Sequence, residues 1–201
     1  GVMPYFDDII VVAVDERDLA RKLKLVLQVF ATNGLRLRKD KCVFKATRLE
    51  FLGHQVGADG ISAVEDKVAS IQKAPLPTNK KELQAFLGMI GFYQPFLKDK
   101  ATLAEPLHRL LDKKATWTWE RCHTEAVNKL KNLLSSKSVL LHYSLNRPLG
   151  VVADASPYGV GAVLFHTMED GSERPVAYYS RTLSAAERNY SQTDRESVAI
   201  V

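Results

Sequence analysis

The chain has 201 residues, 46% of them hydrophobic and 25% charged, which is the composition of ordinary globular domains and argues against disorder throughout. Its formal net charge of +5 favours a polyanionic partner, although an excess this mild is common on proteins that never touch nucleic acid. The two cysteines, Cys42 and Cys122, are far apart and belong to no Cys-x-x-Cys motif, so the sequence predicts neither a disulfide scaffold nor a structural zinc site.

The first elements are predicted to be two short strands joined by an acidic turn. Residues 2–6 have strand character, Asp7 and Asp8 follow as the turn, and the β-branched run 9–12 forms the second strand. The apolar run 9–14 is far shorter than the roughly 20 residues of a membrane-spanning helix, so we expect no membrane partner.

A long amphipathic helix is predicted next, over residues 16–32. Its apolar residues recur at helical spacing, and Asn33 with Gly34 supplies a stop signal. A strand over residues 49–56, a turn at residues 58–60 and a further short strand are predicted to follow.

Helices separated by proline-rich links are predicted after Ser62, the clearest link lying at residues 74–77, and this change of character marks a domain boundary. Helices are predicted to begin after Asn79 and to cover residues 101–111 and 121–135. The last of these has an apolar face formed by Ala126, Val127, Leu130, Leu133 and Leu134.

Strands return in the C-terminal part of the chain. They are predicted over residues 149–153, 160–165 and 175–179, with glycine-containing turns between them. A helix is predicted to start near Thr193.

The Asp7-Asp8 pair is the first candidate for chemistry. Carboxylates at the tip of a hairpin could meet a polyphosphate through divalent metal ions, and two-metal phosphoryl transfer needs such anchors. An isolated acidic pair is more often a plain polar turn. Against that interpretation, a tight two-residue hairpin favours glycine or asparagine, and neither occurs here.

Short motifs occur in one order along essentially the whole chain. They are Tyr5-Phe6-Asp7-Asp8, Leu37 with Lys41-Cys42 and Phe44, Phe51-Leu52-Gly53-His54, Phe86-Leu87-Gly88 with Phe92-Tyr93 and Phe96, Asp154-Ala155-Ser156, and Glu196 ahead of Ala199-Ile200-Val201. Each motif alone is weak evidence. Together their order and spacing resemble the reverse transcriptase of Gypsy-type LTR retrotransposons.

The resemblance implies an α/β (α+β) chain in three parts. Residues 1–60 would be the C-terminal part of a reverse transcriptase palm, with the YxDD loop and the primer grip. Residues 61–137 would be a helical thumb with connecting helices, and residues 138–201 the truncated N-terminal half of an RNase H-like fold. The parent activity would be RNA-directed DNA synthesis coupled to cleavage of RNA in RNA/DNA hybrids, both by two-metal phosphoryl transfer.

The resemblance assigns the polymerase site to the N-terminal part. Asp7 would bind catalytic metal with Asp8 beside it, and Tyr5 and Phe6 would shape the floor under the primer terminus. Lys41 would lie near the incoming triphosphate, where a lysine could protonate the leaving pyrophosphate. A solvated basic loop is an equally good interpretation of that lysine.

The same resemblance assigns a primer grip and a ribonuclease site. The primer grip, which positions the primer's 3′ end, would consist of Phe51, Leu52, Gly53 and His54. Asp154, at the end of a strand, and Glu196, on the following helix, would bind one metal pair. Without the motif context both would be read as ordinary surface acids. The implied cofactor is Mg²⁺, for which Mn²⁺ could substitute.

The implied partners are an RNA/DNA hybrid or DNA primer-template, deoxynucleoside triphosphates, and other segments of the pol polyprotein. Both sites need further carboxylates, from upstream of Gly1 and beyond Val201, so the fragment alone is expected to be inactive. Pro4, expected to remove a donor from its strand ladder, and Gln94-Pro95, in place of a basic pair, depart from the family pattern. An inactive retroelement remnant and a non-catalytic nucleic-acid-binding module stay open as alternatives.

Overall fold

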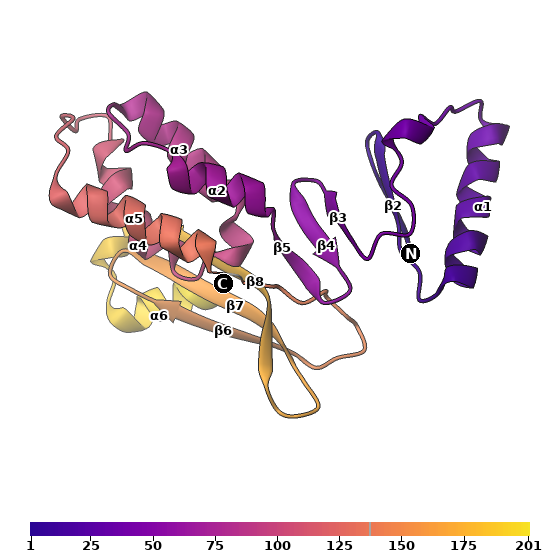
Figure 1. Ribbon diagram of the computed structural model, residues 1–201. Helices are drawn as coiled ribbons and strands as arrows, with labels where there is room; N and C mark the ends of the chain where they lie inside the picture. The colour runs from indigo at the N-terminus through magenta and orange to yellow at the C-terminus, as the bar shows by residue number, and fades with distance from the viewer. Residues whose placement is uncertain (137) are drawn as a thin grey trace. The chain divides into compact units, whose positions relative to one another are not determined.

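The structure, a computed structural model, describes residues 1–136 and 138–201, and this part of the chain falls into two compact units, Gly1–Leu52 and Gly53–Val201 (Figure 1). The described residues contain six α-helices and eight strands, which confirms the predicted α/β class. No helix in these residues combines the length and the apolar character needed to cross a membrane.

The first unit holds a hairpin, a long helix, a turn of 3₁₀ helix and a third strand. In chain order these are β1 (Val2–Tyr5), β2 (Asp8–Val11), α1 (Glu16–Thr32), η1 (Lys39–Lys41) and β3 (Arg48–Phe51). Within residues 1–52, all of which the structure describes, Ile10 is the only buried hydrophobic side chain, at 7% exposure. The unit therefore has almost no core of its own.

The β1–β2 hairpin has a tight two-residue turn. Tyr5 pairs with Asp8, so the turn consists of Phe6 and Asp7, and Phe6 has a left-handed φ of 49°. A positive φ in the turn gives the backbone twist that two-residue hairpins favour. The prediction that both aspartates form the turn is therefore wrong for Asp8, which is the first residue of β2.

Pro4 fits the hairpin without costing it a hydrogen bond. Gly1 and Val12 exchange both backbone hydrogen bonds, at 2.6 and 2.8 Å. Bonded and non-bonded pairs alternate along an antiparallel ladder, so the pair of Pro4 with Ile9 is a non-hydrogen-bonded one. The expectation that Pro4 removes a donor from this ladder is wrong, because its nitrogen points away from β2.

Helix α1 has the predicted bounds and begins at a capping residue. The Asp15 side chain accepts a hydrogen bond from the backbone N–H of Asp18 at 2.8 Å. Asp18 binds Lys22 at 2.5 Å and Arg21 at 2.7 Å, and these hydrogen bonds lower the pKa of Asp18 to about 2. Lys22 also donates to the carbonyl of Val12 at 2.9 Å, which ties the helix to the end of the hairpin.

The second unit opens with a hairpin and continues through four helices. In chain order its elements are β4 (His54–Gly57), β5 (Gly60–Ala63), α2 (Glu65–Lys73), α3 (Lys80–Phe92), η2 (Gln94–Phe96), α4 (Lys100–Leu110) and α5 (Arg121–Ser135). Helix α5 has the predicted bounds, and α3 begins where predicted because Asn79 caps it. The single strand predicted over residues 49–56 is wrong, since Leu52 and Gly53, with φ of 51° and 77°, interrupt it.

The helices enclose one hydrophobic core, whose fully buried side chains include Leu83, Ile90, Leu97, Leu107, Val127 and Leu130. The predicted apolar face of α5 is confirmed, although Leu133 is only partly buried. The prediction missed Lys131, which is buried on the same helix. Its ammonium group donates to the carbonyls of Gln72 at 3.2 Å and Ala74 at 2.5 Å, at the C-terminal end of α2.

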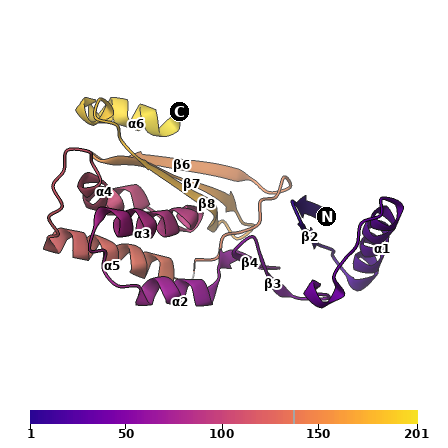
Figure 2. The ribbon, with the colours of Figure 1, turned by 90° about the horizontal axis from the view of Figure 1, so that it is seen from above.

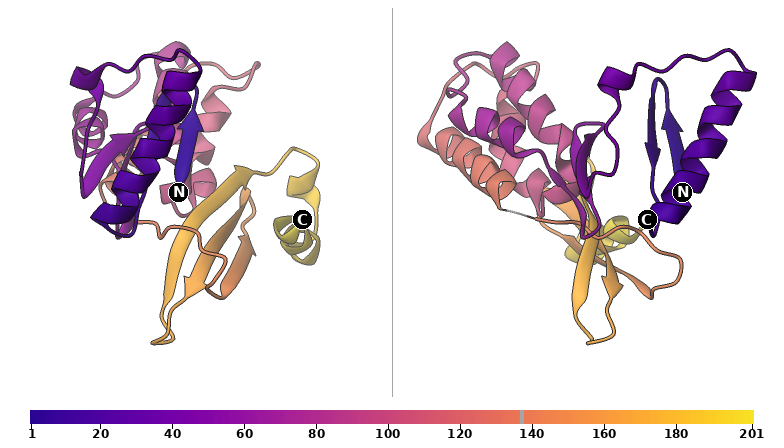
Figure 3. Two further views of the ribbon diagram at one scale, coloured as in Figure 1. Left: turned by 90° about the vertical axis from the view of Figure 1, so that its right-hand side faces the viewer. Right: turned by 45° about the vertical axis from the view of Figure 1, so that its right-hand side comes forward.

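The C-terminal elements form an antiparallel sheet with β7 in the centre. They are β6 (Leu149–Ala155), β7 (Gly159–Thr167), β8 (Glu173–Thr182), η3 (Glu187–Asn189) and α6 (Gln192–Ile200). The sheet has α6 on one side and α3, α4 and α5 on the other (Figure 2). The β7–β8 hairpin extends past the helices (Figure 3), and its strands are longer than predicted because pairing continues beyond the apolar runs.

Candidate functional site

The acidic hairpin tip is open to solvent. Asp7 and Asp8 are both exposed, and Phe6 between Tyr5 and Asp7 is 92% exposed. The Phe6 and Tyr5 rings meet edge to face, with centroids 5.0 Å apart and planes at 85°. Lys41 lies on η1 of the same unit and is also exposed. Their carboxylate, aromatic and ammonium groups are therefore accessible to a ligand.

His54, the last of the predicted primer-grip residues, begins β4 and packs into an aromatic cluster. Its ring stacks on that of Phe92 with centroids 4.8 Å apart and planes at 9°. Tyr93 and Phe96 also contact the imidazole. Burial lowers the pKa of His54, and the positive charge of Lys67 lowers it further. Protonation of the stacked ring is therefore disfavoured.

Gly53 is fitted closely to the same cluster. It has a φ of 77°, and a Cβ atom there would lie 2.8 Å from Cζ of Phe92. Glycine allows both the left-handed backbone and this approach. The turn that carries Gly53 and His54 is therefore seated on the end of α3, while Phe51 and Leu52 belong to the first unit.

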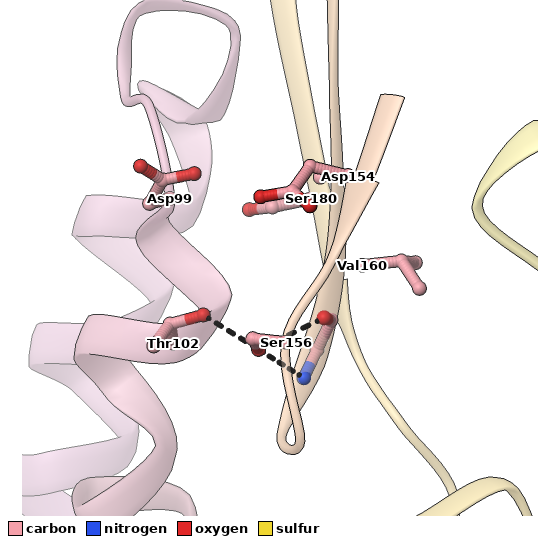
Figure 4. A pocket seen from close by; sticks show the side chains of 8 residues that line it. Asp99, Thr102, Asp154, Ser156, Val160 and Ser180 are labelled. Atoms are coloured by element: carbon pink, nitrogen blue, oxygen red, sulfur yellow. Dashed lines mark hydrogen bonds between the residues drawn. The ribbon is translucent and has the colours of Figure 1, made fainter. Parts of the chain in front are cut away.

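Asp154 lines a small cavity of about 20 Å³ next to α4 (Figure 4). Asp99, Thr102, Ser156 and Ser180 are also in its wall. The Thr102 and Ser156 hydroxyls are 3.1 Å apart, and Asp154 Oδ1 accepts a hydrogen bond from the N–H of Ala155 at 2.9 Å. The Asp154 carboxylate thus has hydroxyl groups and one further carboxylate around it.

Glu196 is exposed on α6 and is connected to the end of β6 through Gln192. The Gln192 amide donates to Glu196 Oε1 at 2.8 Å and to the carbonyl of Ala155 at 3.0 Å. Asp154 faces the cavity beside α4, whereas α6 covers the opposite face of the sheet (Figure 2). Gln192 therefore joins the helix with one predicted ligand to the strand with the other. Sequence reasoning missed it, because its role depends on a carbonyl 37 residues away.

Gln94, which the sequence marked only as a departure from the family pattern, connects η2 to β8 through a polar contact. Gln94 donates to the carbonyl of Ser180 at 3.2 Å, and Lys100 donates to Gln94 Oε1 at 3.2 Å. Lys80 donates to two carbonyls, of Asp112 at 2.9 Å and Ala115 at 2.8 Å. The ammonium groups of Lys80 and Lys100 thus have structural partners inside the protein.

The described residues carry acids but do not gather a complete metal centre. In residues 1–136 and 138–201, no three His, Cys, Asp or Glu side chains come together in a way that could hold a metal ion. Carboxylate oxygens are nevertheless the donors that Mg²⁺ and Mn²⁺ prefer. The donor chemistry of Asp7, Asp8, Asp154 and Glu196 therefore fits such a metal.

Two family models match separate regions of the chain. Residues 2–56 match the family described as reverse transcriptase (RNA-dependent DNA polymerase), and residues 119–201 match the RNase H-like domain found in reverse transcriptase. Two segments of the chain are thus similar to reverse transcriptase and to its RNase H-like domain. The reverse transcriptase match covers the acidic hairpin and ends in β4, while the RNase H-like match includes α5, the sheet and α6.

Curated relatives and solved structures are similar to this chain over its whole length. The Transposon Tf2-3 and Tf2-7 polyproteins of Schizosaccharomyces pombe are each 32% identical to it over 200 residues. The chain spans only 15% of the length of these relatives. A foamy viral protease-reverse transcriptase solved with double-stranded DNA has a TM-score of 0.87 and 22% identity, covering 100% of this chain and 35% of that one. The same viral protein solved with an RNA/DNA hybrid has a TM-score of 0.87 and 23% identity, covering 100% of this chain and 27% of that one. The likeness confirms the predicted fold.

Proposed function

We propose that the chain is a segment of an RNA-directed DNA polymerase with an associated ribonuclease H, encoded by a retrotransposon of Gypsy type. The observation that carries the proposal is co-linearity: matches to the two domains lie in one chain, and transposon polyproteins resemble it from end to end. The proposed parts are a C-terminal palm in residues 1–60, a thumb in 61–137 and an RNase H-like domain in 138–201. The boundary at Lys137 lies outside the described residues.

In the polymerase part, Asp7 and Asp8 are proposed to bind Mg²⁺ or Mn²⁺ at the exposed hairpin tip. A bound divalent ion would stabilise the charge that develops on the transferred phosphoryl group. Tyr5 and Phe6 would support the primer terminus, and Lys41 would lie near the triphosphate. Because no third acid lies beside the two aspartates in the first unit, the remaining ligands would come from other segments of the polyprotein.

In the ribonuclease part, Asp154 and Glu196 are proposed to bind metal from the two faces of the sheet at the end of β6, where Gln192 would orient Glu196. Hydrogen bonds to a ligating carboxylate fix its direction and raise metal affinity. The primer grip is assigned to Phe51, Leu52, Gly53 and His54. The proposed partners are an RNA/DNA hybrid or DNA primer-template and deoxynucleoside triphosphates, in line with the nucleic acids bound by the foamy viral relatives.

The proposal is tested by comparing this chain with a longer polypeptide that includes the rest of the palm and the fingers. The longer polypeptide should extend a primer in Mg²⁺, and the 201-residue chain should not. Asp7→Asn should abolish synthesis while leaving hybrid binding nearly unchanged, because it removes a metal ligand and not a phosphate contact. Asp66→Asn, which makes the same charge change at an exposed residue of α2, should leave synthesis intact.

Two outcomes would contradict the proposal. Extension by the 201-residue chain would mean that no further carboxylate is needed. Full synthesis by the Asp7→Asn polypeptide would remove Asp7 from the site. A longer polypeptide that binds hybrid but neither synthesises nor cleaves would favour the non-catalytic binding module.

A further inference from the structure

The segment after α5 makes hydrogen bonds to two separate sheets within three residues. Leu140 exchanges both backbone hydrogen bonds with Ile61 of β5, each at 2.8 Å. The next residue, Leu141, donates its N–H to the carbonyl of Pro175 in β8 at 2.8 Å. His142 Nε2 then lies 2.6 Å from the carbonyl of Gly57 at the end of β4.

This arrangement follows from extended backbone. In an extended chain, the hydrogen-bonding groups of successive residues point to opposite sides. Leu140 can therefore pair with the β4–β5 hairpin while Leu141 pairs with β8. The Leu140 and Leu141 side chains are 3% and 7% exposed, and Leu140 belongs to the helical core. Burial makes these backbone bonds costly to exchange for water.

Gly60 makes the close approach possible. It has a φ of 138°, and a Cβ atom there would lie 2.1 Å from the carbonyl oxygen of Leu140 and 2.9 Å from Cγ1 of Val139. Real Cβ contacts are not this short, so any larger residue would have to push the segment away from the hairpin. Gly60 therefore lies where the β4–β5 hairpin contacts the segment after α5.

We propose that residues 140–142 form a positioning strap that holds the β4–β5 hairpin in a fixed register with the RNase H-like sheet. The functional part of this inference rests on the proposed function, in which the hairpin begins with the primer-grip residues Gly53 and His54. The strap then sets the distance along the hybrid between the primer's 3′ end and the position at which RNA is cut. Coupling of this kind needs a physical connection between the two sites, and the strap supplies one.

The strap itself is tested on the 201-residue chain by a distance measurement between spin labels. Labels are placed at Ala58→Cys in the β4–β5 turn and Tyr179→Cys on β8, both exposed, with Cys42 and Cys122 changed to serine. The parent should give one narrow distance distribution. Gly60→Ala should broaden it about two-fold or more, because the added methyl group displaces the strap.

Gly34→Ala is the matched control, since Gly34 also has a positive φ, of 71°, but a Cβ atom there would meet nothing within 4 Å. It should leave the distribution unchanged. If Gly60→Ala does not fold, His142→Ala, which removes only a side-chain hydrogen bond to Gly57, should give a smaller broadening with faster exchange of the Ile61 and Leu141 amides. A distribution as narrow as the parent's in either folded variant would overturn the strap.

The functional consequence is measured separately, on the longer polypeptide with an RNA/DNA hybrid. The parent should cut the RNA at a defined spacing from the primer's 3′ end. Gly60→Ala should spread the cuts over neighbouring positions while total cleavage persists. An unchanged cutting register would refute the coupling. Absence of all cleavage and synthesis in the parent would refute the proposed function, whereas the strap would still be judged by the label distances.

Discussion

Removing the buried ammonium group of Lys131 should weaken the contact between α2 and α5. Lys131→Met keeps the length of the side chain and its apolar stem but deletes the donors to the carbonyls of Gln72 and Ala74. A hydrogen bond from a charged group contributes about 1.5–3 kcal/mol, and methionine recovers part of this by avoiding the desolvation of a cation. We therefore expect the free energy of unfolding to fall by about 2–4 kcal/mol.

The assay is urea unfolding at pH 7 followed by tryptophan fluorescence. It reports the second unit because Trp117 and Trp119, the two tryptophans of the chain, both pack against the helical core. Lys129→Met is the matched control, since Lys129 is exposed on the same helix and should change stability by less than about 0.5 kcal/mol. If Lys131→Met is as stable as the control, the ammonium group does not hold α2, and its burial needs another explanation.

Three further predictions concern the proposed primer-grip turn and the proposed ribonuclease site. Burial, with a positive charge nearby, lowers the pKa of His54 below 6.5, so the unfolded chain takes up a proton that the folded unit does not. The free energy of unfolding should therefore fall as the pH drops from 6.5 towards the folded pKa, and urea titrations across this range should show a weaker dependence for His54→Phe. Gly53→Ala should cost about 1–3 kcal/mol more than Gly171→Ala, because both have a positive φ but only Gly53 meets an aromatic ring; equal losses in thermal unfolding would contradict this. In the longer polypeptide, Gln192→Leu should lower RNA cleavage about 10–100-fold without changing DNA synthesis, whereas Ser197→Ala on the same helix should change neither, and undiminished cleavage would exclude the orienting role.

Elements with a strong local signal were predictable from the sequence. Helix α5 has its predicted bounds because a regular apolar stripe runs through it, and α3 begins after a capping asparagine. The strands of the C-terminal sheet were placed correctly but made too short, since pairing with a neighbour extends a strand beyond its apolar run. The division of residues 49–56 into two strands was missed because Leu52 adopts a left-handed conformation that its own type disfavours.

Long-range contacts could not be predicted from local sequence patterns. Lys131 lies on the polar edge of a predicted stripe, and its burial depends on the end of a helix 57 to 59 residues away. Gln94 looked like a loss of positive charge, but it pairs with a strand 86 residues further on. The acids of the candidate sites could be named from motifs alone. Their surroundings could not, because the cavity beside Asp154 is built from three separate parts of the chain.

Helix α4 packs closely on the C-terminal sheet, in the segment that resembles an RNase H-like domain. The N–H of Ala101 donates to the Ser180 hydroxyl at 3.1 Å, and the Ala101 methyl group lies 3.1 Å from where a Cβ atom of Gly159 would be. Small residues on both sides let helix and strand backbones approach closely. One wall of the cavity at Asp154 comes from α4 itself, through Asp99 and Thr102. A ligand of Asp154 on this face would therefore contact a surface that α4 helps to build, so changes in α4 should alter the site proposed at Asp154 as well as the proposed thumb.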